Sequence, residues 1–428
     1  MISKVPSALL SYLRGNMRPL VESAFAIFVG LVVGGLILLV LHYNPIDGYV
    51  SMFKGFGIFI EQRNFGLTEF AYALAFATPY MLTALTFAVG MRAGLFNIGA
   101  EGQVYIGGAA AAWIAGHFAL PVGFHVFAVT IIAMLAGALW ALVPALLKIR
   151  RGVHEVISAI MLNWIAYYLV MYLAIYHLSG KYAHITAEAL PTARYEVLGM
   201  VGRIDLIAMI SVILAVCLGV YILLWRTRVS HIGFIQRWRM MLFGLIVGGS
   251  YVAFAYVNQH FGKLMGGNLT TVIYVAIALC VGVYVFLWRM YPGYEIRLVG
   301  DNPDAARYAG ISISRAILLS FIIGGLAAGL AGASLAIRPT NWGFNSTLGD
   351  FVGYGFVGIG VALVGRNHPI GIIPSAIFFG GLENSGRYLE ADLGVSSELV
   401  GGIQGIIIMA MALPLLVLLL ARLRRKAK

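Results

Sequence analysis

Charge is scarce in this sequence: only 11% of its 428 residues are Asp, Glu, Lys or Arg, whereas 61% are hydrophobic. Long apolar runs extend from end to end, and the mean hydropathy is +0.91. This composition excludes an ordinary water-soluble domain and is typical of a polytopic membrane protein.

Cysteine is rare and the common catalytic motifs are missing. Cys217 and Cys280 both lie in apolar runs, so the sequence has neither a disulfide framework nor a metal-ligand spacing. No GxSxG or HExxH motif is present, which gives no support to a membrane hydrolase. No GxxxxGK(S/T) loop is present either, so we expect this chain to hydrolyse no nucleotide itself and to bind no cofactor or metal.

What the sequence does contain is a series of apolar segments. A membrane-spanning helix needs about 20 mostly apolar residues. We therefore predict an all-α fold, a polytopic bundle of about 10 to 12 transmembrane helices forming a single domain over residues 1–428. The twelve candidate spans lie at 22–41, 69–90, 99–117, 123–147, 155–178, 205–225, 241–257, 271–288, 315–337, 351–366, 369–382 and 399–421. The tenth and eleventh are short enough to be half-helices or re-entrant segments.

Basic residues outnumber acidic ones by 29 to 17. Their distribution along the chain indicates membrane topology and not nucleic-acid binding. If both termini are cytoplasmic, most Lys and Arg residues fall in the inner loops and most acidic residues in the outer ones, which is the positive-inside pattern. We therefore predict no nucleic-acid binding, and a multi-pass chain with both termini in the cytoplasm. The first apolar stretch is long and lacks a cleavage-site pattern, so a retained helix is expected.

An internal repeat marks the middle of the chain. The run LGVYILLWR at 218–226 recurs as VGVYVFLWR at 281–289. The block between them holds an additional pair of apolar segments, which we interpret as a helix pair inserted by local duplication over residues 227–288. Glycine is abundant, with 52 residues, and gathers in clusters such as IGGLAAGLAGA at 323–333. Because small residues let membrane helices approach closely, a tightly packed bundle is expected.

One charged stretch, GYEIRLVGDNPDAARYAGISISR at 293–315, lies between the eighth and ninth predicted spans. Asn302 is predicted to cap a short helix, with Pro303 at its first position, Asp304 at the positive end of its dipole and Gly310 at its end. A short helix held between two spans suits docking into another protein's groove. An ordinary cytosolic loop accounts for the pattern equally well.

A second stretch, RAGLFNIGAEGQ at 92–103, combines three glycines with polar residues just before an apolar run. It predicts an unwound segment leading into a helix N-terminus. Glu101 near the membrane is costly unless it faces a cavity or a partner. It either hydrogen-bonds substrate or gates its path, or it is a structural carboxylate at a helix start near the cytoplasmic interface.

Other polar residues are weaker candidates. Asn163 and Trp164 lie within the fifth span, where they either line a pathway or pack between helices. Asn384, Ser385 and Arg387 are expected in a solvated outer loop. The candidate substrate-pathway residues are Asn97, Glu101, Gln103, Tyr105, Asn163 and Trp164.

Three stretches together carry a family resemblance. The charged stretch closely resembles the cytoplasmic coupling segment of ABC importer permeases of the branched-chain amino acid, simple sugar and nucleoside superfamily. GLFNIGAEGQVYIGGAAAAW at 94–113 and GYGFVGIGVALVGRNHPIGIIPSAIFFG at 353–380 are similar to two further motifs of that family, in the same order. All three resemble nucleoside-type permeases more than the ribose or leucine types. The block near 227–288 departs from the usual ten-span member.

This resemblance implies a transport subunit in a bacterial cytoplasmic membrane. In such a system a cytoplasmic ABC ATPase binds ATP and magnesium and grips the coupling helix, while an extracytoplasmic binding protein delivers substrate to a pair of permeases. The second permease is expected to be a distinct chain, with a second copy of this chain as the alternative. The residues that the resemblance assigns to ATPase coupling are Asp301, Asn302, Asp304, Ala305, Ala306, Arg307 and Gly310.

Nucleosides are the expected substrate, imported by alternating access. They are neutral, so the scarcity of charge within the spans agrees with them, but it agrees with simple sugars too. Branched-chain amino acids also remain open. An ion-coupled secondary transporter is less favoured, because such carriers usually keep ionisable residues within the membrane for coupling.

Overall fold

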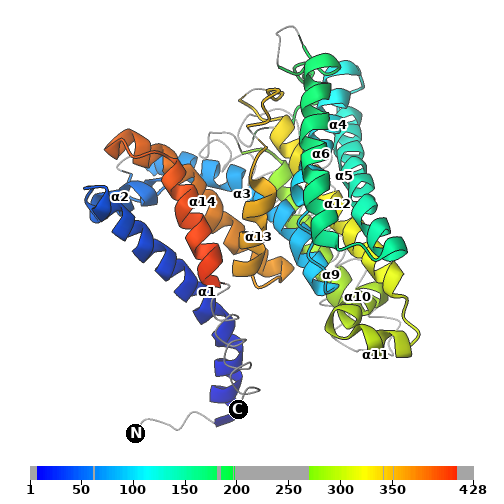
Figure 1. Cartoon of the computed structure of the whole chain (residues 1–428). Helices are drawn as coiled ribbons and strands as arrows, with labels where there is room; N and C mark the ends of the chain where they lie inside the picture. The colour runs from blue at the N-terminus through cyan, green and yellow to red at the C-terminus, as the bar shows by residue number, and fades with distance from the viewer. Residues whose placement is uncertain are drawn as a thin grey trace, which may run out of the picture.

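The computed structural model describes residues 7–60, 63–180, 185–195, 197, 269–340, 342–349 and 351–411. Within these ranges the regular structure is α-helical, with three isolated β-bridges and no strand (Figure 1). The helices are α1 (Ser7–Val40), α2 (Pro45–Lys54), α3 (Arg63–Arg92), α4 (Ala100–His117), α5 (Phe124–Arg151), α6 (Glu155–Tyr176), α9 (Val272–Arg289), α10 (Tyr291–Asp301), α11 (Pro303–Tyr308), α12 (Ile313–Ala336), α13 (Tyr354–Val364) and α14 (Pro369–Leu393). The predicted all-α bundle is confirmed.

Six of the described helices are long and apolar enough to cross a membrane. They are Glu22–Val40, Gly66–Arg92, Phe124–Arg151, Glu155–Tyr176, Val272–Arg289 and Ile313–Ala336. Each matches a predicted span to within a few residues. A shorter apolar helix, Glu398–Met411, begins where the last span is predicted. The predicted spans at 205–225 and 241–257, and with them most of the inserted block at 227–288, lie outside the described residues.

The two segments expected to be short behave differently from one another. α13 has 11 residues, about 16 Å, so the prediction of a half-helix within 351–366 is confirmed. The prediction for 369–382 is wrong, because α14 continues to Leu393 and its 25 residues measure about 37 Å.

The error at α14 comes from buried polar side chains. The sequence predicts that Asn384 and Ser385 lie in a solvated loop, yet both are fully buried. Asn384 Nδ2 donates to Glu69 Oε2 at 2.9 Å, and Ser385 Oγ donates to the Met52 carbonyl at 2.6 Å. Polar residues remain inside a membrane bundle when neighbouring elements satisfy them. The helix end predicted from hydropathy therefore comes before the actual end of α14.

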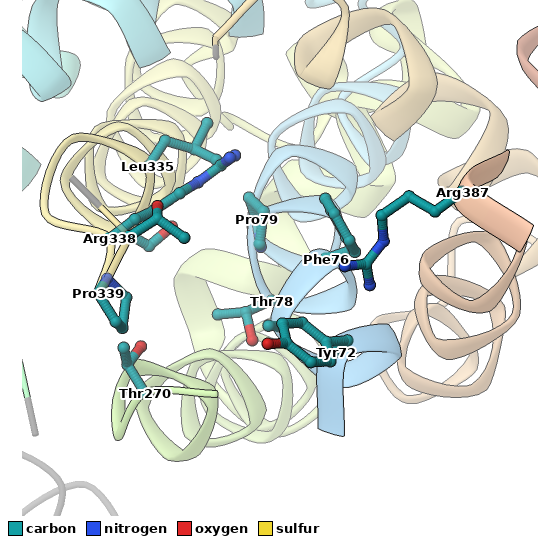
Figure 2. A pocket seen from close by; sticks show the side chains of 12 residues that line it. Tyr72, Phe76, Thr78, Pro79, Thr270, Leu335, Arg338, Pro339 and Arg387 are labelled. Atoms are coloured by element: carbon teal, nitrogen blue, oxygen red, sulfur yellow. The ribbon is translucent and has the colours of Figure 1, made fainter. Parts of the chain in front are cut away.

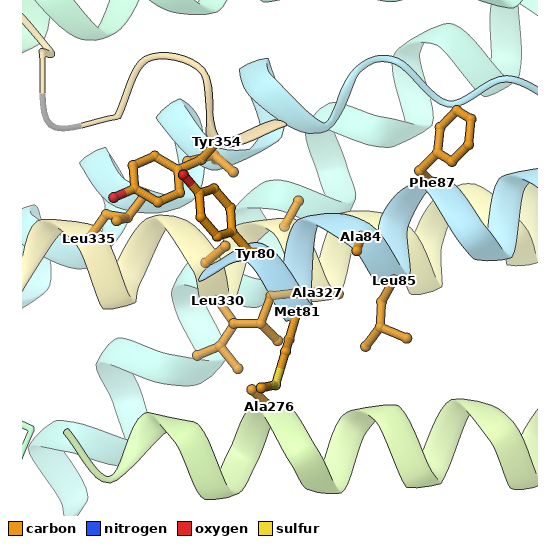
Figure 3. Packing of buried hydrophobic residues seen from close by; sticks show 14 of the residues in the cluster. Tyr80, Met81, Ala84, Leu85, Phe87, Ala276, Ala327, Leu330, Leu335 and Tyr354 are labelled. Carbon is orange, nitrogen blue, oxygen red and sulfur yellow. The ribbon is translucent and has the colours of Figure 1, made fainter. Parts of the chain in front are cut away.

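α12 forms the centre of the bundle and packs against α3, α4 and α5 (Figure 3). Its small residues allow this close approach. A Cβ atom on Gly329 would lie 2.2 Å from the Ala133 carbonyl oxygen of α5, and one on Gly332 would lie 2.1 Å from the Val104 carbonyl oxygen of α4. Helix backbones in contact at glycine are the packing expected of membrane helices, so the predicted tight bundle is confirmed.

The connecting segments gather on two opposite faces of the bundle (Figure 1). On one face, segment 185–195 pairs with segment 342–349: the Thr186 amide donates to the Phe344 carbonyl at 3.1 Å. On the other, which we call the α11 face, residues 290–312 lie close to Arg92 and to the turn at 365–368, where Arg92 Nε donates to the Asn367 carbonyl at 3.1 Å. The segments grouped on each face are those that the predicted topology places on the same side of the membrane.

The α12 packing can be tested with two glycine-to-alanine changes. Gly332→Ala places a methyl group against backbone atoms of α4, and overpacking of this kind costs about 1–3 kcal/mol. We expect a lower midpoint of thermal unfolding in detergent, measured by fluorescence-detected size exclusion. Gly282→Ala in α9 is the matched control: beyond the backbone of α9 and the residues next to it in sequence, no atom of the described residues lies within 4 Å of its new methyl group, so its midpoint should be unchanged or raised. Equal midpoints for the two variants would contradict the packing.

Candidate functional site

The polar stretch at 92–103 forms a break between two helices. α3 ends at Arg92 and α4 begins at Ala100, and Gly94 between them has φ of +72°. The Asn97 side-chain oxygen accepts hydrogen bonds from the Gly99 amide at 3.2 Å and from Gln103 Nε2 at 3.3 Å. The predicted unwound segment before a helix N-terminus is therefore confirmed.

Glu101, in the first turn of α4, holds the start of α13. Its Oε1 accepts from the Gly353 amide at 2.6 Å and from the Tyr105 hydroxyl at 2.9 Å, and its Oε2 accepts from the Gly355 amide at 2.6 Å. The first amides of a helix lack partners within the helix, and a carboxylate there is also favoured by the helix dipole. A Cβ atom at Gly355 would lie 2.5 Å from the Glu101 amide nitrogen, so the two backbones are in direct contact. We call this arrangement of Glu101, Gly353 and Gly355 the carboxylate latch.

The carboxylate latch lies well inside the bundle. Along α4, 16 residues or about 24 Å separate Glu101 from His117, at the end of α4 away from the α11 face. Along α13, 11 residues or about 16 Å separate it from the turn at 365–368 on the α11 face. The alternative of a structural carboxylate at a helix start agrees with the position of Glu101 in the first turn of α4, and its contacts with α13 give it that structural role. A direct role in substrate binding or gating stays a prediction.

A cavity of about 450 Å³ opens beside the carboxylate latch. Its walls are largely aromatic. Trp164 and Tyr168 of α6 stack with ring centroids 6.1 Å apart and an interplanar angle of 26°, and Tyr105 meets Tyr167 edge to face at 5.8 Å. Trp164 and Tyr168 are each more than half exposed, so their ring faces are accessible. The complete lining is Glu101, Tyr105, Ile160, Asn163, Trp164, Tyr167, Tyr168, Val352 and Phe356.

Asn163 connects α6 to the beginning of α4. Its Oδ1 accepts from the Gly102 amide at 2.9 Å, and its Nδ2 donates to the Ile98 carbonyl at 3.0 Å. Both ends of the amide are thus engaged with backbone. Asn163 forms part of the cavity wall, yet its direct role is to fix the break against α6.

The structure brings four of the six predicted pathway residues together. Glu101, Tyr105, Asn163 and Trp164 line the cavity, whereas Asn97 of the break and Gln103 of α4 are buried and do not line it. Sequence reasoning missed the remaining lining residues. Tyr167 and Tyr168 lie three and four residues after Trp164, so the helical periodicity of the sequence places them on the same helix face as Trp164. Val352 and Phe356 come from a distant segment and carry no such signal.

A second pocket, of about 220 Å³, is lined by residues of α3, of the end of α12 and of α14 (Figure 2). Arg338 and Arg387 lie on opposite sides of it, with Tyr72 and Pro79 of α3 between them. Arg338 Nη2 donates to the Tyr354 hydroxyl at 2.9 Å, and the Tyr354 ring packs 5.0 Å from that of Tyr80 (Figure 3). The first turn of α13 is therefore held by Arg338, which lines the second pocket, and by Glu101, which lines the first cavity.

The predicted coupling segment forms the short helix α11 on the α11 face. The Asn302 side chain accepts from the Asp304 and Ala305 amides at 3.1 and 3.0 Å, and Gly310 ends the turn with φ of +76°. The predicted cap and stop are confirmed. Of the seven coupling candidates, Asp301, Asn302, Asp304, Ala305, Arg307 and Gly310 are exposed, whereas Ala306 is fully buried and anchors the helix to its own chain.

Replacing the latch carboxylate should destabilise the bundle. Glu101→Gln keeps the size of the side chain but presents an NH₂ group to one of the two amide donors, and a lost hydrogen bond to a buried charged group costs about 1.5–3 kcal/mol. We expect a clearly lower unfolding midpoint in detergent. Tyr105→Phe, which removes the single hydrogen bond that the Tyr105 hydroxyl donates to the same carboxylate, is the graded control and should lower the midpoint less. A midpoint for Glu101→Gln equal to that of the unmodified chain would contradict the latch.

Comparison with known proteins agrees with this architecture. The family described as the branched-chain amino acid transport system permease component matches residues 70–412. The chain is 31% identical over 397 residues to the guanosine ABC transporter permease protein NupP of Bacillus subtilis, covering 93% of this chain and 94% of the relative. It is 30% identical to the glucose ABC transporter permease protein TsgB13 of Haloferax volcanii, with 90% and 84% covered, and 29% identical to the nucleoside ABC transporter permease protein NupB of Lactococcus lactis, with 95% and 94% covered.

No solved structure gives a significant match to the chain. The family match nevertheless covers most of the chain and contains the break, the carboxylate latch, α11 and α13. With the three motifs and the helical bundle in agreement, this chain belongs to the branched-chain amino acid transport system permease family of membrane transport subunits.

Proposed function

We propose that this chain is the membrane subunit of an ATP-driven importer of nucleosides. The observation that carries the proposal is the aromatic cavity beside the carboxylate latch. Its volume falls within the range of small-molecule sites, and its polar groups are few. Flat heterocyclic bases stack on accessible aromatic rings, and the stacked pair of Trp164 and Tyr168 supplies such a surface.

The charge of the cavity also suits a neutral substrate. Among the described residues, Glu101 is the only acidic side chain in the lining, and it already accepts hydrogen bonds from two amides and one hydroxyl. No lysine or arginine of the described part of the chain lines the cavity. A zwitterionic amino acid would leave its own charges without partners at such a site, and unpaired buried charge is strongly unfavourable. Relatives named for guanosine and nucleosides support the same substrate class.

The orientation follows from charge. The α11 face carries many arginines, among them Arg92, Arg297, Arg307 and Arg366, and positive residues concentrate on the cytoplasmic side of bacterial membrane proteins. We infer that the α11 face is cytoplasmic, that both termini lie on that side, and that the membrane is the bacterial cytoplasmic membrane. α11 then faces a cytoplasmic ABC ATPase, which binds ATP and magnesium, while a binding protein approaches the opposite face.

The cavity is open along α6, where the ring faces of Trp164 and Tyr168 are accessible. A second permease, which we expect to be a distinct chain, closes that side. Alternating access follows when the ATPase moves α11 and the two permeases change their relative tilt. The half-helix α13, held at its first turn, contributes Phe356 to the cavity wall, so a shift of α13 changes the cavity.

Stacking in the cavity predicts an effect of Trp164 on uptake. In a strain lacking this gene, the chain with Trp164→Ala should import radiolabelled uridine or adenosine with a KM raised roughly 5- to 150-fold, because stacking contributes about 1–3 kcal/mol per base. Trp164→Phe should retain most of the affinity. Trp113→Leu is the control, since Trp113 is half exposed on α4 and lies outside the cavity. Uptake of labelled glucose but not of nucleosides by the unmodified chain would overturn the substrate assignment.

Docking at α11 predicts that its charges control assembly. Exchanging the charges with Asp304→Lys and Arg307→Glu together should reduce the amount of ATPase that copurifies in mild detergent at least several-fold. The matched control exchanges the charges of an ion pair on the opposite face with Lys54→Glu and Asp392→Lys. Lys54 Nζ lies 2.7 Å from Asp392 Oδ2, and the two side chains have similar exposed fractions. Copurification unaffected by the α11 exchange would rule out docking through these charges.

A further inference from the structure

A cluster of aromatic and basic side chains on the α11 face is not explained by substrate binding or by docking. Its centre is Trp288, at the end of α9. The guanidinium carbons of Arg92 and Arg297 lie 5.1 and 5.4 Å from the centroid of the Trp288 ring, and the His368 ring lies 5.0 Å away. Tyr284 stacks on the same indole at 5.4 Å. One side chain thereby contacts groups from α3, α10 and the turn that precedes α14.

Both arginines beside the indole also donate hydrogen bonds to backbone carbonyls. Arg297 Nε donates to the Leu287 carbonyl at 2.9 Å, which joins α10 to α9. Arg92 Nε and Nη2 donate to the Asn367 and Arg366 carbonyls at 3.1 and 3.4 Å. Arg366 and Asn367 have φ of +60° and +51°, a left-handed conformation that is uncommon for residues other than glycine. Arg92 therefore bonds to the carbonyls of an unusual turn that links α13 to α14.

α10 makes a second contact with α3 that needs no side chain. A Cβ atom on Gly300 would lie 2.3 Å from the Arg92 carbonyl oxygen and 2.8 Å from the Gly94 amide nitrogen. The backbone of α10 thus lies directly on the break between α3 and α4. Glu101 follows seven residues after Gly94, so displacement of α10 acts on the segment that carries the latch.

The contacts around Trp288 and the contact at Gly300 both connect to the carboxylate latch. From the indole, the route runs through the turn at 365–368 and along the 11 residues of α13 to Gly355 and Gly353. From Gly300, it runs through the break to Glu101, which accepts the amides of those two glycines. The coupling segment and the cavity are therefore joined by two short packed connections that converge on the carboxylate latch.

We propose that Trp288 is a positioning residue for transport, through which movement of α10 and α11 displaces the turn at 365–368 and, with it, α13 and the cavity wall. This role rests on the proposed function, since it requires an ATPase docked at α11. The cation–aromatic contacts suit it because they hold two arginines on one ring without fixing a single hydrogen-bond geometry, so the elements shift together.

The test uses the complete transporter, copurified with its ATPase and reconstituted in proteoliposomes. For the spectral measurement alone, a nitroxide is attached at Phe356→Cys on α13 in a chain whose native Cys217 and Cys280 are replaced by alanine. Hydrolysis and uptake are measured on chains without the label and with Phe356 intact, because Phe356 lines the cavity. Three quantities are measured: ATP hydrolysis, nucleoside uptake per ATP, and the change in the nitroxide spectrum on trapping with ATP and vanadate. In Trp288→Leu we expect hydrolysis within twofold of the unmodified chain, uptake per ATP reduced at least tenfold, and loss of the spectral change.

Trp288→Phe keeps an aromatic face for the two arginines and should show an intermediate loss in uptake per ATP. Trp113→Leu, a tryptophan away from this cluster, should match the unmodified chain in all three quantities. The proposal is overturned if Trp288→Leu keeps both the spectral change and the ratio of uptake to hydrolysis. It is equally overturned if both Trp288 variants fail to assemble with the ATPase, because the residue is then structural only.

The spectral readout separates this proposal from the substrate assignment. If the unmodified transporter shows the ATP-dependent spectral change but imports no nucleoside, the substrate assignment fails, and the role of Trp288 is still decided by the spectrum. If the unmodified chain brings no ATPase with it, the proposed function and the role of Trp288 fall together.

Discussion

The carboxylate of Glu101 meets a requirement that the bilayer imposes. A helix that begins inside a membrane exposes amide groups that no water can satisfy, so a half-helix is stable only where protein atoms complete its first turn. Glu101 completes the first turn of α13 with two acceptor oxygens and a charge that complements the dipole. The position of α13 and the shape of the cavity beside it both depend on this contact.

The same constraint explains why α12 is rich in small residues. Two interruptions, the break before α4 and the start of α13, must be enclosed by protein because irregular backbone is not tolerated against lipid. Glycines on α12 let α4 and α5 approach to backbone contact, and the Tyr80 and Tyr354 rings close the remaining space beside α3. Close packing and interrupted helices therefore occur together. A break can be enclosed only if the neighbouring helices have small side chains where they cross it.

Local patterns predicted local structure well in this chain. Apolar length gave the positions of the six long spans, because lipid selects on hydropathy alone, and Asn302, Pro303 and Gly310 defined α11 through turn chemistry that acts within a few residues. The end of α14 was missed because Asn384 is satisfied by Glu69, more than 300 residues away in sequence. Phe356 and the ring of contacts around Trp288 were missed for the same reason, since partners brought together by folding leave no periodic signal in one sequence. Glu101 was identified as important, but its partners at Gly353 and Gly355 were not.

The residues that hold the carboxylate latch differ from the residues with the most exposed side chains in the cavity wall. Asn163 and Glu101 are engaged with backbone, whereas Trp164, Tyr168 and Phe356 present free faces and bear little of the architecture. Natural variation can therefore exchange the rings without endangering the frame, and recognition can diverge while the mechanical parts stay constant. Two relatives of this chain that share about 30% of its residues carry the names of a purine nucleoside and of a hexose, so one helical scaffold accompanies more than one named substrate.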